Sequence, residues 1–212
     1  MMHQKPCIIF DMDGTLIDSS AAMTQSVNFV RASIGLEPIT KNDLEYYINQ
    51  PDQHLAKIFY NTAEYDPAHK ALFKDHYLAS SSRSIALYPY VREMLESLHQ
   101  KATLNIATNA SDFFATHMLE HLGILDFFTH VRGSNNVELP KPHPQMIEMI
   151  MRESSSTKVK TILVGDSIKD EMAAQRADVR FIFASWGYGT SETASLRARD
   201  IQELLRLLDS FI

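Results

Sequence analysis

The sequence predicts an α/β fold built on a parallel β-sheet. Short, continuously apolar runs recur along the chain, which is typical of strands that are buried on both faces. Each run is followed by a stretch with the apolar spacing of an amphipathic helix. Strand alternating with helix in this way indicates an α/β sheet with right-handed crossovers. One long stretch after the first apolar run departs from the alternation, because its patterns are helical only.

The expected strands begin close to the N-terminus. We expect strands at residues 7–10, 104–108, 161–165 and 181–185, with a further short strand at 129–131. Apolar residues at helical spacing predict helices over 91–98, 118–122, 147–151 and 201–208.

Residues 18–84 contain no convincing buried strand. Helical patterns cover 21–34, 41–48, 53–63 and 67–80, and turn-forming glycine and proline residues separate the first three. We therefore expect a small helical domain at 18–84, inserted after the first strand, with a serine-rich linker at 80–84. Residues 1–17 and 85–212 would then form the core that carries the sheet.

The composition limits the classes of function. The chain has 212 residues, of which 45% are hydrophobic and 22% charged, enough to bury a substantial core. The formal net charge of −6, with no run of Lys or Arg, argues against binding to nucleic acid or anionic membranes. No apolar segment approaches the ~20 residues that span a bilayer, and no signal-peptide pattern precedes the first strand. We expect a cytoplasmic protein, a monomer or dimer, whose single cysteine, Cys7, is a buried thiol.

Carboxylates follow two of the expected strands directly. Asp11 and Asp13 come after the first strand, and Asp166 and Asp170 come after the strand "TILVG". Because the carboxyl ends of parallel strands meet at one crevice, we expect these side chains to lie together, with Lys141 from the loop "LPKPHP". Carboxylates this close repel one another and would bind protons unless a cation neutralised them. Oxygen ligands alone favour a hard divalent ion, so the sequence predicts a Mg²⁺ site.

Four segments together resemble the motifs of a known superfamily. "DMDGTLID", Thr108-Asn109, Lys141-Pro142 and "GDSIKDEMAA" look like the four motifs of the haloacid dehalogenase-like hydrolases, closest to phosphoglycolate-phosphatase-like members with an inserted helical cap. The resemblance implies a Rossmann-like core with the active site at the strand ends and a cap that closes over it. It also implies Mg²⁺-dependent hydrolysis of a small phosphate monoester, with phosphoglycolate leading and sugar phosphates and nucleoside monophosphates close behind.

The resemblance also implies roles for individual residues. Asp11 would attack phosphorus and form an aspartyl-phosphate, and Asp13 would protonate the leaving group and then activate water. Mg²⁺ would be held by Asp11, the backbone carbonyl of Asp13, and Asp166. An acid at Asp13 also argues for an oxygen leaving group, because a halide needs no proton.

The remaining motif residues would serve the phosphate group. Thr108 and the backbone around Asn109 and Ala110 would donate hydrogen bonds to its oxygens, and Lys141 would stabilise its equatorial charge. Asp170 would orient Lys141 or the metal shell. The segment "WGYG" at 186–189 lacks the third glycine of a dinucleotide-binding fingerprint, so we expect a loop near the rim of the site.

Two alternatives remain open at this stage. One is a phosphomutase of the β-phosphoglucomutase type, although "DGTLID" looks more like the phosphatase form. The other is a non-catalytic module that binds a phosphorylated metabolite, which the intact set of motif residues disfavours. In the helical insertion, the candidates for binding a second anionic group of the substrate are Arg31, Lys41, Lys57 and Arg83. Gln50 and Gln53 flank a turn and are candidates for facing the crevice. Lys41 and Lys57 are also weak candidates for a Schiff-base lysine in a phosphonate-cleaving enzyme.

Overall fold

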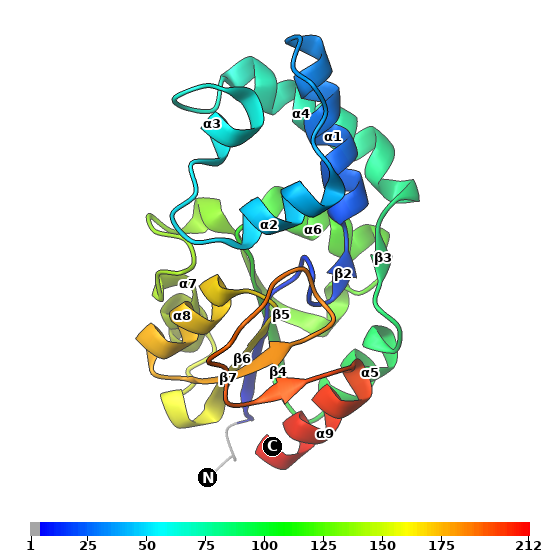
Figure 1. Cartoon of the computed structure of the whole chain (residues 1–212). Helices are drawn as coiled ribbons and strands as arrows, with labels where there is room; N and C mark the ends of the chain where they lie inside the picture. Colours follow the sequence, from blue (N-terminus) through cyan, green and yellow to red (C-terminus); the bar gives the residue numbers. More distant parts are fainter. Residues whose placement is uncertain (1–4) are drawn as a thin grey trace.

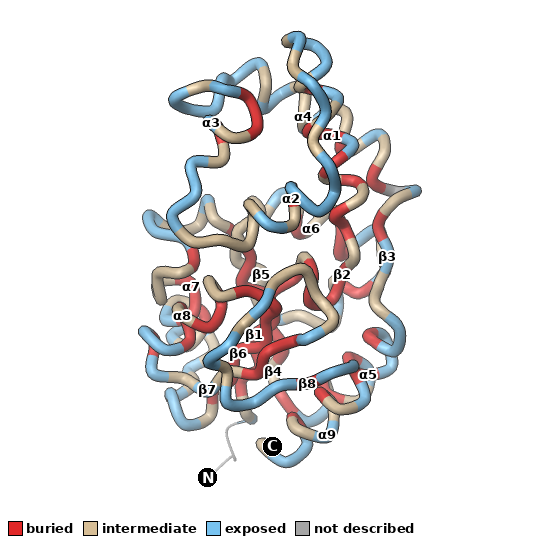
Figure 2. Tube along the Cα trace, viewed as in Figure 1, coloured by how far each residue is buried: buried red, intermediate tan, exposed pale blue. Residues whose placement is uncertain are grey.

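Strand β1 (Cys7–Phe10) lies in the middle of the sheet, and each of its four side chains is fully buried. A computed structural model, which describes residues 5–212 apart from the side chain of Ser82, shows why this run is continuously apolar (Figure 1). Ile8 and Phe10 pack into the core on one face of the sheet, while Cys7 and Ile9 pack into the core on the other. Figure 2 shows buried residues gathered around β1.

Within residues 5–212 the main sheet has six strands in the order β5-β4-β1-β6-β7-β8, and every adjacent pair is parallel. Phe10 lies opposite Ile106 on one side and Val164 on the other, so β1, β4 and β6 end at the same edge. The neighbours of β1 are β4 (Thr103–Ala107) and β6 (Thr161–Gly165). The remaining strands are β5 (Phe128–Arg132), β7 (Arg180–Ala184) and β8 (Arg197–Ala198).

Helices cover both faces of this sheet. The apolar sides of α5 (Val91–Leu98), α6 (Asp112–His121) and α9 (Ile201–Phe211) pack against the face that carries Ile8 and Phe10. The opposite face is covered by α7 (Gln145–Glu153) and α8 (Ile168–Ala177). The predicted α/β class with a parallel-sheet core is therefore confirmed.

Four further helices lie together beyond the carboxyl ends of the strands, at the end of the molecule opposite the two termini (Figure 1). They are α1 (Ser20–Ser33), α2 (Lys41–Asn49), α3 (Leu55–Tyr60) and α4 (Pro67–Ser80), which we call the α1–α4 unit. They share a separate apolar cluster that includes Val30, Leu44 and Phe59. A two-stranded antiparallel pair, β2 (Ile17–Asp18) with β3 (Ala86–Leu87), joins the two chain connections between this unit and the sheet.

The differences from the expected elements have local causes. The sequence did not predict β2, β3 or β8, because two-residue strands are too short to show a pattern. The helix expected at 53–63 covers only Leu55–Tyr60, since Asn61 adopts a left-handed conformation with φ of 57° that ends it. The serine-rich linker contains a short 3-10 helix, Ser81–Arg83.

Two expectations concern features outside the site. Cys7 is a free, buried thiol, as predicted. Over the described part of the chain, no helix has the length and apolar character needed to cross a lipid bilayer.

Shortening a core side chain on α9 tests the packing of this helix against the sheet. Leu204 is fully buried there, so Leu204→Ala is expected to lower the free energy of unfolding by about 2–5 kcal/mol, measured by urea denaturation. The matched control, Gln202→Ala, changes an exposed residue of the same helix and should stay within about 0.5 kcal/mol of wild type. Equal effects of the two substitutions would contradict this packing.

Candidate active site

The register of the sheet brings the predicted residues to one place. Asp11 follows β1 directly, and its backbone N–H donates to the Val164 carbonyl at 2.8 Å, which continues the pairing of β1 with β6. Asp166 follows β6, and Asp170 lies in the first turn of α8. Carboxylate oxygens of Asp11, Asp166 and Asp170 lie within 4.8 Å of one another, and all three residues are buried.

Lys141 bridges two of these carboxylates from the loop that precedes α7. Its Nζ lies 2.6 Å from Asp11 Oδ1 and 2.5 Å from Asp170 Oδ1. Burial disfavours the charged amine, but the carboxylates of Asp11 and Asp170 outweigh it and raise the pKa of Lys141 above its ordinary value. Lys141 is therefore a fixed ammonium group inside the site.

The side chain of Asn109 holds the backbone of Lys141 in place. Asn109 Nδ2 donates to the Lys141 carbonyl at 2.8 Å, and the Lys141 N–H donates to Asn109 Oδ1 at 3.0 Å. Beside it, Thr108 Oγ1 accepts a hydrogen bond from the Ala110 N–H at 3.1 Å. The Ala110 N–H, which the resemblance implied would face a phosphate, thus has a partner within the chain in this structure.

Asp166 is held by donors from two loops. Its Oδ2 accepts from the N–H groups of Tyr188 at 2.7 Å and Gly189 at 3.3 Å, and its Oδ1 accepts from Thr15 Oγ1 at 3.2 Å. The segment 186–189 thus lies at the site, as the sequence predicted for "WGYG". Gly187 allows this close approach, because a Cβ there would overlap the Asp166 side chain.

The carboxylates carry more negative charge than Lys141 balances. Burial, together with the charge of Asp170, raises the pKa of Asp166 to about 7. Burial also raises the pKa of Asp11 well above its usual value, although Lys141 opposes the shift. A cluster of buried carboxylate oxygens with surplus negative charge has the chemistry of a Mg²⁺ site, and the residues present fit such an ion.

Asp13 lies apart from this cluster and lines a cavity. Its carboxylate accepts a hydrogen bond from Ser19 Oγ, and burial raises the pKa of Asp13 above its ordinary value. The Ser19 N–H in turn donates to the Tyr188 hydroxyl at 2.7 Å. The carboxyl group of Asp13 is thereby oriented by the residue that precedes α1.

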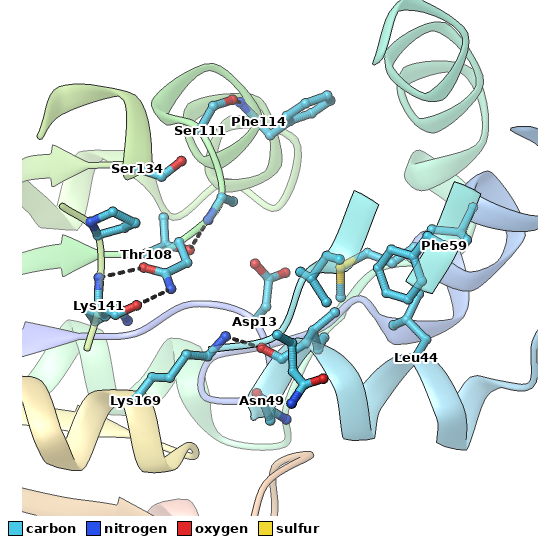
Figure 3. A pocket seen from close by; sticks show the side chains of 18 of the residues that line it. Asp13, Leu44, Asn49, Phe59, Thr108, Ser111, Phe114, Ser134, Lys141 and Lys169 are labelled. Atoms are coloured by element: carbon cyan, nitrogen blue, oxygen red, sulfur yellow. Dashed lines mark hydrogen bonds between the residues drawn. The ribbon is translucent and has the colours of Figure 1, made fainter. Parts of the chain in front are cut away.

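The cavity has a volume of about 840 Å³ and lies between the strand ends and the α1–α4 unit. In Figure 3, Thr108 and Lys141 lie on one side of Asp13, and Leu44 and Phe59 of the α1–α4 unit lie on the other. Six of the seven predicted site residues line this cavity, namely Asp11, Asp13, Thr108, Asn109, Lys141 and Asp170. The seventh, Asp166, is buried and is not part of the lining. One wall thus carries charged and polar groups, while the other is largely apolar.

Lys169, which the sequence patterns did not single out, connects the two walls. Its Nζ donates to the backbone carbonyl of Ile48 in α2, which the dashed line in Figure 3 marks. Burial lowers the pKa of this amine below its ordinary value. Thr15, Ser19 and Tyr188 were also missed, although their positions inside or close to recognised motifs were an available signal.

The cations expected to read a second anionic group lie elsewhere. Arg31 donates to the backbone carbonyls of Glu37 at 2.6 Å and Phe59 at 2.5 Å. Lys41 and Lys57 pair with neighbours on their own helix or its end, Glu45 at 3.5 Å and Asn61 at 2.7 Å. None of Arg31, Lys41, Lys57 and Arg83 lines the cavity, so the structure does not bring these candidates to it, whereas Gln50 and Gln53 line it.

The chain is similar to known proteins over most of its length. Residues 8–184 match the family model described as haloacid dehalogenase-like hydrolase. A phosphoglycolate phosphatase of Agrobacterium fabrum is 32% identical over 191 residues, covering 86% of this chain and 82% of its own length. A phosphoglycolate phosphatase of Vibrio vulnificus is 28% identical over 214 residues, covering 95% and 94%.

Solved structures share the fold. A crystal structure described as a predicted phosphoglycolate phosphatase from Haemophilus somnus superimposes with a TM-score of 0.85 at 24% identity, covering 98% of this chain and 100% of the other. A haloacid dehalogenase-like family hydrolase from Streptococcus pneumoniae gives 0.81 at 21% identity, with coverage of 98% and 100%. The chain therefore belongs to the haloacid dehalogenase-like hydrolase family, in its phosphoglycolate-phosphatase-like subgroup.

Proposed function

We propose that the protein is a Mg²⁺-dependent phosphatase that hydrolyses a small phosphate monoester through an aspartyl-phosphate. One observation carries this proposal. The carboxylate of Asp11 is fixed at the end of a buried strand, 2.6 Å from the ammonium group of Lys141, and shares one cavity with the carboxyl group of Asp13. A nucleophile, a cation and an acid then face the same space.

In the first step a carboxylate oxygen of Asp11 attacks phosphorus, and the bond between phosphorus and the alcohol oxygen breaks. Asp13 gives its proton to that oxygen, so the product leaves as a neutral alcohol. The raised pKa of Asp13 favours the protonated form that this step requires. The hydrogen bond between Asp11 and Lys141 restricts the orientation of the nucleophile, which in-line attack demands.

In the second step water hydrolyses the aspartyl-phosphate. The Asp13 carboxylate takes a proton from water, the oxygen of that water bonds to phosphorus, and the bond from phosphorus to Asp11 breaks. Inorganic phosphate leaves, and both carboxyl groups return to their starting states. Lys141 and Thr108 stand at the same cavity, where they would bind the phosphoryl oxygens.

Asp11 and Asp166, with the backbone carbonyl of Asp13, would hold Mg²⁺. When bound, the ion supplies positive charge that lets an anionic nucleophile approach an anionic ester. Asp170 would keep Lys141 in position through their 2.5 Å contact. Asn109 would do the same through the backbone of Lys141.

Residues 18–84, which contain the α1–α4 unit, would act as a cap over the cavity. Lys169 and the Ile48 carbonyl provide a direct contact between the cap and the core. The names of the curated relatives make phosphoglycolate the first substrate to test. Sugar phosphates and nucleoside monophosphates belong in the same panel.

Replacing the nucleophile should abolish phosphate release. Asp11→Asn keeps the size of the side chain but removes the attacking charge, so kcat should fall by at least about 10³-fold. The measurement is phosphate release from a panel of monoesters with Mg²⁺. The control, Asp209→Asn, changes an exposed carboxylate and should leave the rate unchanged.

Three results would count against the proposal. Release that persists in Asp11→Asn would remove Asp11 as the nucleophile. Transfer of phosphate to a sugar without release would indicate a phosphomutase. Ligand-induced stabilisation without turnover in the wild type would indicate a binding module.

Removing the buried ammonium group should destabilise the fold. Lys141→Met leaves two buried carboxylates without their counter-charge, so the free energy of unfolding without Mg²⁺ should fall by about 3–5 kcal/mol. The matched control, Lys101→Met, breaks an exposed pair with Asp209 and should cost less than about 1 kcal/mol. Similar losses in the two variants would refute the role of Lys141 in charge balance.

Magnesium should stabilise the protein through the same carboxylates. Saturating Mg²⁺ should raise the melting temperature of the wild type, because the ion binds the folded state and offsets its carboxylate repulsion. Asp166→Asn should weaken Mg²⁺ binding, measured by calorimetry, by about tenfold or more. Asp209→Asn again serves as the control, and an unchanged affinity in Asp166→Asn would place the ion elsewhere.

A further inference from the structure

The cavity is much larger than a two-carbon leaving group requires. Its volume of about 840 Å³ lies in the range, roughly 300–1,000 Å³, of pockets that enclose drug-sized ligands. Six aromatic side chains line this space, besides aliphatic, polar and charged ones. These aromatic side chains, which we call the aromatic wall, are Phe59, Tyr60, Tyr65, Phe73, Tyr77 and Phe114.

The aromatic wall crosses from the α1–α4 unit to the core. Phe73 and Tyr77 on α4 stack with their ring centres 5.6 Å apart. Phe114 on α6 stands edge-on to both, at 6.0 Å from Phe73 and 5.4 Å from Tyr77. A surface of packed rings provides a large apolar contact area with a preference for flat groups.

Two residues that line the cavity each carry a buried side-chain nitrogen without a hydrogen-bond partner. Among the described residues, Asn49 Nδ2 and His69 Nδ1 are buried without one, and both side chains line the cavity. Asn49 is the last residue of α2, and the His69 ring on α4 lies 5.5 Å from that of Tyr60. Buried polar atoms are normally satisfied, so these two point to a ligand that supplies the missing partner.

The lysines of the cavity already have neighbours. Lys70 lies over the ring of Tyr65 at 5.6 Å, and Lys74 lies over the ring of Phe113 at 4.2 Å. Lys169 donates to the Ile48 carbonyl. No arginine of residues 5–212 lines the cavity, so a carboxylate on the alcohol part of a substrate would meet no guanidinium group.

We propose that Asn49, His69 and the aromatic wall form a subsite for the alcohol part of the substrate. The alcohol that fits is neutral, larger than glycolate, and carries an aromatic or heteroaromatic ring with a hydrogen-bond acceptor. The ring packs on the aromatic wall, and its acceptor takes the hydrogen bond that the amide of Asn49 offers. This inference rests on the proposed phosphatase function, because it assigns a substrate class to the same site.

Three phosphonates test the subsite without turnover, because a methylene group replaces the ester oxygen. They are 2-(pyridin-3-yl)ethylphosphonate, 2-phenylethylphosphonate and 3-phosphonopropanoate, the last being the analogue of phosphoglycolate. Calorimetry with the wild-type protein and Mg²⁺ should give the pyridyl compound at least tenfold higher affinity than 3-phosphonopropanoate. The phenyl compound, which lacks the acceptor, should bind with intermediate affinity.

Variants assign the preference to residues. Asn49→Leu should reduce the affinity for the pyridyl compound to that for the phenyl compound and leave the latter unchanged. Asn42→Leu, at an exposed position of the same helix, should change neither. Should Asn49→Leu fail to fold, the series on the wild type decides.

Two results would overturn the subsite. Equal wild-type affinities for the pyridyl and phenyl compounds would exclude a donor role for Asn49. Tightest binding of 3-phosphonopropanoate, lost in Lys169→Met, would show that the cavity recognises a small acid through Lys169.

Turnover of the corresponding esters separates this inference from the proposed function. Binding of pyridin-3-ylmethyl phosphate, with no hydrolysis of it or of any other ester in the panel, would leave the subsite in place and reject the phosphatase. Hydrolysis with kcat/KM at least tenfold higher for phosphoglycolate would keep the phosphatase and reject the subsite.

Discussion

The buried carboxylates at the ends of β1 and β6 need cations and hydrogen-bond donors, and this need governs the loops and helices around them. Asp11, Asp166 and Asp170 bring three carboxylates into a buried space, and Lys141 supplies one ammonium group between two of them. Such a cluster is stable only when every oxygen has a donor or a cation. The surrounding elements meet this demand, because the loops at Thr15 and Tyr188 donate to Asp166. Several loops of the fold therefore serve to hold one anionic cluster.

Much of the fold followed from pattern alone. The run Cys7–Phe10 is continuously apolar because its side chains alternate between two covered faces, and this pattern predicts a strand in a parallel sheet. The position of Asp11 at the end of that strand followed from the same reasoning, as did the convergence with Lys141. The order of strands and helices along the chain, together with the parallel direction of the strands, was enough to predict these contacts.

The contacts that escaped prediction depend on the packing of residues distant in sequence. The contact of Lys169 with Ile48 joins residues 121 positions apart in the sequence, and no local pattern predicts a contact over that separation. Arg31 was one of four candidates for binding a second anionic group, and its guanidinium group donates instead to the carbonyls of Glu37 and Phe59. The sequence does not show which backbone carbonyls need a hydrogen-bond donor, since this depends on the conformation that the chain adopts there.

The short β2–β3 pair has a mechanical consequence. Both chain connections between the α1–α4 unit and the sheet pass through these paired residues, so they define a single hinge axis. Ser19 comes one residue after β2, and its hydroxyl holds Asp13. A rotation of the α1–α4 unit about that axis would displace Ser19, the residue that orients Asp13. In the proposed mechanism, such an opening would leave Asp13 without its partner, so proton donation would be confined to the closed arrangement.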